Sequence, residues 1–404
     1  MVLIGDYVPG ELSVELPVEF AGEMVLANLE SPIIPLPSPQ NCLELPVKSG
    51  PRLVSRGVGI AEGTGVSLAF SLANNHIMDY GVSGLESTLD YLHNRGIANC
   101  GARLKVEDAR EPMIVSDHGK LIGIIGCCES QFGSRNRADL GPWVLDTVRR
   151  LRSRVDYVIV SCHAAMEDCP FPSPFLRAYY RQLIDAGANV VHGHHSHIAQ
   201  GWEEYGGGVV FYGLGNAVVD PRKWPPLFNR QSLAVIVDFS GTSVRYSVRR
   251  CQCEMNDKGH VALSCDKIES NAEFVRYMDI CRRAFHDDCR AEGYWQEMAL
   301  RLFDETYGDF LCLPYPWKHR LTVFNRIHYA FFGLRKLTEA LLGRTLGDSR
   351  GVSEAANVYN CFQCVSHSEM IKSAMGVRLG NVQDFRNEAT SRDCDEIARM
   401  LRVM

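Results

Sequence analysis

The chain has 404 residues, of which 46% are hydrophobic and 22% are charged, as in an ordinary globular protein long enough for two domains. Its formal net charge of -6 provides no broad cationic surface for a nucleic-acid backbone, so we expect no nucleic-acid partner. No uninterrupted apolar stretch reaches the roughly 18 residues of a spanning helix, so we also expect no membrane span.

Short apolar runs alternate with amphipathic segments over roughly the first two-thirds of the chain. The amphipathic segments 81–96 and 172–187 each end in a glycine, where a left-handed helix cap is expected. Apolar runs buried on both faces and separated by helices predict an α/β architecture. The predicted strands are 1–5, 24–29, 66–72, 120–128, 155–163, 188–194, 208–214 and 232–239.

The remaining segments have different patterns. Residues 31–51 are rich in proline and have no period, which indicates an ordered surface loop that could lie over a site. From about residue 241 the sequence predicts a closing hairpin, and beyond about residue 266 the pattern becomes helical. We therefore predict two domains, an α/β domain over 1–265 and a helical domain over 266–404.

The fifteen cysteines are odd in number, and the opening MVLIGDYVPG has none of the parts of a signal peptide. Both features favour a reducing cytoplasm, with reduced and partly buried thiols. Cys361, Cys364 and His367 have a metal-like spacing, but no second pair follows at zinc-site spacing. A structural zinc ion there stays an alternative to free thiols.

Polar side chains gather where the predicted strands end, and in α/β sheets the loops at strand ends form the ligand crevice. Carboxylates, an amide oxygen and imidazoles together suit Mn, Fe or Zn better than calcium. His195 and His197 are one residue apart and can serve two metals or two positions on one metal, although a histidine-rich loop without a ligand remains the alternative. The residues are Asp6, Asn28, Glu30, Asn74 to His76, His163 and His192 to His197.

These motifs resemble the CapA family, which is linked to capsule and poly-γ-glutamate synthesis and belongs to the calcineurin-like metallophosphatase superfamily. The resemblance covers about residues 1–250 and implies a four-layer α-β-β-α metallophosphatase-like sandwich holding two metal ions between facing sheets, followed here by the helical domain. It rests on GD at 5–6, NLESPI at 28–33, ANNHIMDYGVSGL at 73–85, His163, GHHSHIAQG at 193–201 and FYGLGNAVVD at 211–220.

The resemblance also implies a role for each matching residue. His76 is the group that stabilises or protonates the reacting centre. The implied ligands are Asp6 and His197 for the first metal, Asn75, His163 and His195 for the second, and Glu30 as the bridging carboxylate.

The same motifs contain further candidates. Asn28, Asn74 and Lys48 are candidate substrate contacts, although Lys48 is equally interpretable as a solvated lysine. Asp79 and Asn216 could each orient a ligand histidine or cap a turn.

The chain departs from the family pattern at a few positions. His192 and His194 are additional histidines, which we interpret as packing or orienting groups rather than ligands. Val8 stands where many metallophosphatases have a histidine, which leaves the first metal one protein ligand short. Ser196 stands where the family commonly has proline, at a position that is not a ligand.

The expected function is that of a dinuclear metal-dependent hydrolase. Its metals would be Mn, Fe or Zn, and its substrate an anionic small molecule, peptide or polymer cleaved at a phosphoester or a γ-glutamyl-type amide. The alternative is a non-catalytic accessory protein that supports a poly-γ-glutamate or capsule synthetase. In either case the helical domain could act as a lid, mediate homo-oligomer formation or bind a synthetase partner.

Overall fold

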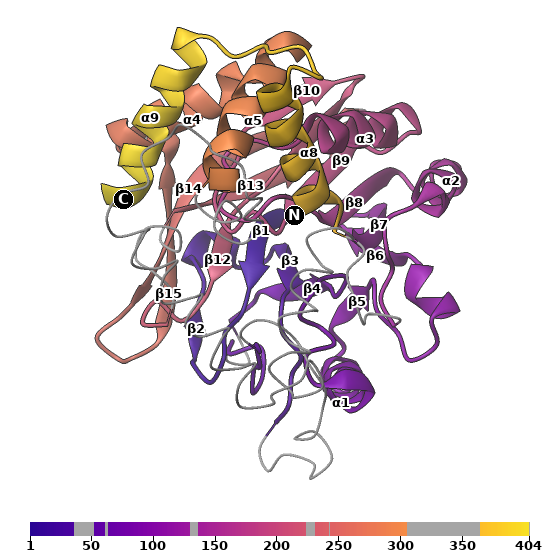
Figure 1. Ribbon diagram of the computed structural model, residues 1–404. Helices are drawn as coiled ribbons and strands as arrows, with labels where there is room; N and C mark the ends of the chain where they lie inside the picture. The colour runs from indigo at the N-terminus through magenta and orange to yellow at the C-terminus, as the bar shows by residue number, and fades with distance from the viewer. Residues whose placement is uncertain are drawn as a thin grey trace, which may run out of the picture.

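The computed structural model describes residues 1–35, 52–60, 64–129, 136–223, 231–241, 243–304 and 364–403. Within these ranges the chain forms two β-sheets that face each other, with helices on their outer sides and further helices at the top of the view in Figure 1. The candidate substrate contact Lys48, Cys361 and most of the proline-rich loop lie outside the described residues.

The first sheet has the order β2-β15-β14-β13-β1-β3-β4-β5, and β12 pairs with β1. Its β1, β3, β4 and β5 run parallel, whereas β13, β14 and β15 are antiparallel neighbours, as the predicted closing hairpin requires. The strands are β1 (Val2–Tyr7), β2 (Val14–Glu15), β3 (Met24–Leu29), β4 (Ser67–Ser71), β5 (Ala98–Cys100), β12 (Asn216–Val218), β13 (Ser232–Asp238), β14 (Arg245–Met255) and β15 (Val261–Lys267).

The second sheet has the order β10-β11-β9-β8-β7-β6, with β7, β8, β9 and β11 parallel. Its strands are β6 (Met113–Asp117), β7 (Lys120–Cys128), β8 (Tyr157–His163), β9 (Val190–His194), β10 (Trp202–Tyr205) and β11 (Gly208–Phe211). The sequence predicted all of these strands except the short β6 and β10, both antiparallel edge strands.

Alternate side chains of the strands enter different apolar layers, which is why their sequences are apolar throughout. From β1, Leu3 joins the core between the two sheets, while Ile4 joins the layer covered by α1 (Gly81–His93). On the outer side of the second sheet, α2 (Pro142–Leu151) and α3 (Pro174–Asp185) pack over β8 residues such as Val158. The predicted four-layer sandwich is therefore confirmed.

Two helices end as the sequence predicted. Gly96 follows α1 and Gly187 follows α3, and both have a positive φ, of 63° and 114° respectively. A residue without a Cβ adopts this conformation without steric strain, which explains the glycines.

The helices after β15 are α4 (Ala272–Arg283), α5 (Asp288–Leu302), α8 (Val365–Leu379) and α9 (Glu388–Val403). Their buried side chains, including Phe274, Trp295, Met370 and Ile397, belong to the same hydrophobic cluster as the core between the sheets. The helical C-terminal part thus packs directly on the sandwich, and its independence as a domain from residue 266 stays a prediction.

The cysteines only partly follow the expectation of reduced thiols. Cys251 and Cys265 pair across β14 and β15 and form a disulfide, so the expectation is wrong for this pair. Adjacent antiparallel strands bring their Cα atoms to 4.2 Å, close enough for a bond. Ten other described cysteines are free, and nine of them are buried.

None of the helices in the described ranges combines the length and the hydropathy that crossing a membrane would require.

Glycines allow the strands beneath the candidate site to approach closely. A Cβ atom at Gly193 would lie 2.0 Å from the carbonyl oxygen of Tyr212, and one at Gly5 would lie 1.8 Å from that of Gly215. Both distances are far below van der Waals contact, so only glycine fits. Gly5 precedes Asp6 and Gly193 precedes His194, so the same packing positions candidate site residues.

We therefore predict that Gly193→Ala lowers the free energy of unfolding by about 1–3 kcal/mol, because the backbone around Tyr212 must move. Gly241→Ala is the matched control, since its Cβ would meet nothing closer than 3.6 Å. Urea unfolding of both variants measures the difference. Equal stability of the two variants would contradict the close packing.

Candidate metal centre

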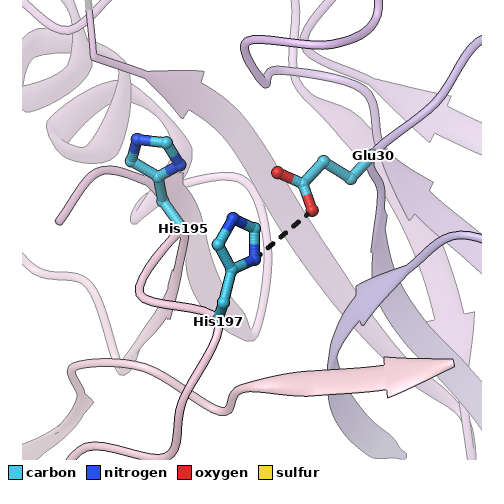
Figure 2. A group of neighbouring side chains, drawn as sticks. All are labelled: Glu30, His195 and His197. Atoms are coloured by element: carbon cyan, nitrogen blue, oxygen red, sulfur yellow. Dashed lines mark ion pairs between the residues drawn. The ribbon is translucent and has the colours of Figure 1, made fainter. Parts of the chain in front are cut away.

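Two buried carboxylates mark the centre of the candidate site. Asp6 lies near the end of β1 and Glu30 directly follows β3, and both are 0% exposed. The loop after β9 brings His195 and His197 to the same place, and Figure 2 shows the His197 ring facing the Glu30 carboxylate, with His195 beside it. Strands of both sheets therefore supply this cluster.

Two groups of potential ligand atoms share Glu30. Asp6, Glu30 and His163 form one group, Glu30, His195 and His197 form the other, and within each group the atoms lie within 4.8 Å of one another. Glu30 Oε1 is 3.4 Å from His163 Nε2, and Glu30 Oε2 is 3.9 Å from His197 Nδ1. A shared carboxylate is what a bridging ligand requires.

The division of the other ligands differs from the one that the resemblance implies. His163 groups with Asp6, its Nδ1 lying 3.7 Å from Asp6 Oδ1, whereas His195 groups with His197. His197 also approaches Asp6, with 3.6 Å between Nδ1 and Oδ2. The allocation of individual ligands to two metals stays a prediction.

Asn75 and His163 meet from opposite sheets. His163 Nε2 lies 2.9 Å from Asn75 Oδ1, and its Nδ1 lies 3.0 Å from Asn28 Nδ2. Because the Asn28 amide nitrogen only donates, His163 Nδ1 accepts and Nε2 carries the proton toward Asn75. Two predicted ligands are thus joined by a hydrogen bond between the sheets.

The histidine loop is held in an uncommon backbone conformation. His195 and His197 have φ angles of 81° and 58°, in the left-handed region that non-glycine residues rarely adopt. The His195 backbone N–H donates to Asp6 Oδ2 at 3.3 Å, and His197 Nδ1 donates to Asn216 Oδ1 at 3.1 Å. Such strain persists only where surrounding contacts hold it and is concentrated at functional sites. Of the two interpretations of Asn216, the contact favours orientation of His197.

Asn28 and Asn74 are 0% exposed and bonded to each other inside the protein. Asn28 Nδ2 donates to Asp6 Oδ1 at 2.8 Å, and Asn74 Nδ2 donates to Asn28 Oδ1 at 3.2 Å and to the Leu29 carbonyl at 2.8 Å. These contacts favour a role in positioning Asp6 and His163. Direct substrate contact by Asn28 and Asn74 stays a prediction.

His76 lies beside the cluster, paired with a carboxylate. Its Nδ1 donates to Asp79 Oδ2 at 2.7 Å, and Asp79 Oδ2 also accepts the Leu53 backbone N–H at 2.8 Å. The contact favours orientation of a histidine over turn capping as the role of Asp79. It fixes the ring and leaves Nε2 as the nitrogen that can exchange a proton with a ligand.

The two additional histidines have different surroundings. His192 is fully buried and donates from Nε2 to the Ile4 carbonyl at 2.9 Å, which is a packing contact between the sheets. His194 Nδ1 lies 3.3 Å from Asp6 Oδ1, and its Nε2 lies 3.2 Å from Ser161 Oγ. His194 thus contacts Asp6 and helps to position its carboxylate.

Sequence reasoning missed two residues at this site. Glu167, in the loop after β8, has a half-exposed side chain with Oε1 3.9 Å from His195 Nε2. His367, from α8, interacts electrostatically with Glu167 and His195. The spacing of Cys361, Cys364 and His367 predicted His367 only as an alternative zinc ligand. Cys364 is a buried thiol that donates to Glu129 at 3.3 Å.

Burial and charge divide the histidines into two kinds. Burial lowers the pKa of His163 well below its usual value and that of His195 to about 4. Burial also disfavours the charged form of His197, but the carboxylates of Glu30 and Asp6 outweigh it and raise the His197 pKa well above its usual value. His194 and His197 likewise outweigh burial and hold the pKa of Asp6 well below its usual value.

The donor set fits a divalent metal centre. It offers carboxylates, one amide oxygen and imidazoles that are neutral in the case of His163 and His195, the form in which histidine binds metal. The protonated His197 supplies the positive charge that the buried carboxylates need. The cluster is therefore compatible with divalent metal binding.

Two facing sheets with outer helices and a buried carboxylate–histidine cluster at their strand ends define a metallophosphatase-like α/β sandwich. The family comparison is more specific, because residues 18–221, about half of the chain, match the model of the bacterial capsule synthesis protein PGA_cap. The chain belongs to this family, as its motifs predicted.

Several curated relatives are similar over the same part of the chain. The PGA biosynthesis protein CapA of Bacillus subtilis is 31% identical over 157 residues, which are 37% of this chain and 41% of the relative. A probable polyglutamine synthesis accessory protein of Mycobacterium tuberculosis is 32% identical over 171 residues, 37% of this chain and 44% of the relative. The chain thus spans about two-fifths of the length of these relatives.

Among solved structures, a novel phosphatase from Mycoplasma pneumoniae has a TM-score of 0.37 and 12% identity, covering 68% of this chain and 95% of its own. A hypothetical protein from Thermus thermophilus has a TM-score of 0.36 and 13% identity, covering 62% of this chain and 98% of its own.

The two kinds of histidine predict how many protons a metal displaces. We expect binding of Zn²⁺ at pH 7 to release about one proton from His197, whereas His163 and His195 bind as neutral imidazoles and release none. A proton on His197 competes with the metal, and the raised pKa of His197 keeps that proton bound. Metal affinity should therefore decrease as the pH is lowered. Calorimetric titrations in buffers of different ionisation enthalpy count the protons.

His197→Ala should abolish most of this proton release, and the exposed His93→Ala should not change it. Metal binding by the wild-type protein without proton release would contradict the charge state assigned to His197.

Proposed function

We propose that the protein is a dinuclear metal-dependent hydrolase. The observation that carries the proposal is the pair of ligand groups that share the buried Glu30. The His76–Asp79 pair beside them adds a candidate proton donor. Asp6, Glu30, Asn75, His163, His195 and His197 would hold two ions of Mn, Fe or Zn.

When bound, such a pair of ions lowers the pKa of water and polarises the bond to be cleaved. The chain's own residues then supply position and protons. Asp79 holds His76 through Nδ1, so that Nε2 of a protonated His76 can give its proton to the leaving atom. Asn28 holds Asp6 and His163 in register through one amide.

The ligand set suits two kinds of substrate, phosphoesters and γ-glutamyl-type amides, because both reactions build negative charge beside the metals. Names of relatives, such as PGA biosynthesis protein, support the amide. We propose an anionic small molecule, peptide or polymer as the substrate.

The alternative is a non-catalytic accessory protein, supported by the words accessory protein in the name of a relative. In that case the C-terminal helices would bind a synthetase or a second copy of the chain. We also propose a cytoplasmic location, which the ten free cysteines among the described residues favour, whereas the Cys251–Cys265 disulfide is typical of an oxidising compartment.

The experiment that tests the enzyme proposal combines metal analysis with activity. Protein purified without chelators should contain about two Mn, Fe or Zn ions per chain and should cleave a member of a panel of phosphoesters and γ-glutamyl amides. His76→Asn should lower kcat about 10²- to 10⁴-fold because a proton donor is lost. Steady-state kinetics provide the measurement, and metal content should not change.

His93→Asn, at the exposed end of α1, is the control and should leave kcat unchanged. Bound metal without turnover on either substrate class would favour the accessory protein.

A further inference from the structure

Residues 136–140 form a short segment that is fixed to strands of both sheets. The Ala138 backbone N–H donates at 2.9 Å to the carbonyl of Gly101, which directly follows β5 of the first sheet. The Ala138 carbonyl accepts at 2.9 Å the backbone N–H of Cys128, the last residue of β7 in the second sheet. Cys128 pairs in register with His163, so the segment lies beside the end of a strand that carries a predicted metal ligand.

The side chain of Arg137, within this segment, bonds to two loops at the candidate metal centre. It is 1% exposed. Its Nη1 donates to the carbonyl of Asn74 at 3.1 Å, and its Nη2 donates to the carbonyl of Glu129 at 2.9 Å. Asn74 belongs to the loop after β4 of the first sheet, whereas Glu129 directly follows β7 of the second. One buried guanidinium group therefore links the two sheets at their strand ends.

Both carbonyl groups are close in the chain or in space to a predicted metal ligand. Asn74 immediately precedes Asn75, and the Glu129 backbone N–H donates to the carbonyl of His163 at 3.0 Å. The two ligands are also in contact, with 2.9 Å between Asn75 Oδ1 and His163 Nε2. The guanidinium group thus joins the same two parts of the chain that this contact joins.

The chemistry of arginine suits such a link. A buried guanidinium group is unfavourable unless its donors are satisfied, and here Nε donates to Asp139 Oδ1 at 3.1 Å while the other two nitrogens bind the carbonyls. Hydrogen bonds from a charged donor are roughly twice as strong as those between neutral groups, and the planar fork fixes their directions. A lysine ammonium group cannot reproduce that fork.

We propose that Arg137 is a positioning residue for the metal centre, which holds the Asn75 loop and the end of the His163 strand at the separation that metal binding requires. It acts through the backbone of Asn74 and Glu129. The proposal rests on the metal centre of the proposed function, but it depends neither on the substrate nor on turnover.

Titration with Co²⁺ tests the proposal, because the visible absorption of bound Co²⁺ depends on the number and geometry of its ligands. Arg137→Met removes the donors and keeps a long side chain in the same space. We expect this variant to bind Co²⁺ about 10- to 100-fold more weakly, as is typical when a residue that holds metal ligands is lost, and to change the absorption spectrum of the bound ion. Unchanged affinity with an unchanged spectrum would overturn the proposal.

Arg177→Met is the matched control, because Arg177 is also a buried arginine, at 4% exposed. Its guanidinium pairs with Glu203 at 3.2 Å and with Asp288 at 2.5 Å, and neither of them is a predicted metal ligand. We expect this variant to be less stable in urea but to bind Co²⁺ as the wild-type protein does. An equal loss of Co²⁺ affinity in both variants would show that only general stability is affected, and the positioning role would fail.

Arg137→Lys covers the case in which Arg137→Met does not fold, since it retains the buried positive charge. Because lysine lacks the planar fork, Co²⁺ affinity should still fall. An affinity equal to that of the wild-type protein would contradict the proposal.

A double-mutant cycle separates this proposal from the proposed hydrolase. If the wild-type protein binds Co²⁺ but cleaves no substrate, the hydrolase function fails, and the Co²⁺ affinities of the variants still decide the role of Arg137. If it binds no Co²⁺, urea unfolding of Arg137→Met, Asn75→Ala and the double variant decides that role. Losses of stability that do not add support the proposal, because both residues then act on one contact, whereas additive losses overturn it.

Discussion

Burial of two carboxylates at one point is the constraint on which the rest of the site depends. Asp6 and Glu30 are both 0% exposed, and isolated buried charges are strongly unfavourable unless positive charge or hydrogen bonds compensate them. Within the protein Asn28 donates to Asp6, and His197 approaches both carboxylates. Carboxylates and imidazoles gathered in this way are also compatible with divalent metal binding.

The architecture makes this concentration possible because strand ends from both sheets meet there. Asp6 and Glu30 belong to strands of the first sheet, whereas His163 and the histidine loop belong to the second. The glycine contacts at Gly5 and Gly193 bring the backbones near these ends unusually close to their neighbours. The strands that pack the core therefore also position the predicted ligands.

The sequence predicted the part of the site that its own local patterns encode. Strand-end motifs such as NLESPI and GHHSHIAQG predicted that Glu30 and His197 converge, because in α/β proteins the loops at strand ends form the ligand crevice. The sequence alone does not show how His163 combines with Asp6 or His195, since this depends on side-chain positions across two sheets. The sequence analysis also missed Glu167. The one feature that could have identified it is its position in the loop after the strand that ends in His163.

The sequence did not place His367 near the ligand cluster, because helical periodicity predicted only that the C-terminal part forms a separate domain. Its position depends on the buried Glu129 carboxylate, which lies 237 residues before Ser366 in sequence and accepts that residue's hydroxyl and backbone N–H. Ionisation of a buried carboxylate is unfavourable, and burial accordingly raises the Glu129 pKa. The hydrogen-bond donors at the start of α8 therefore stabilise the buried Glu129 carboxylate. The same contact fixes the first turn of α8 against the end of the second sheet, which helical periodicity alone does not predict.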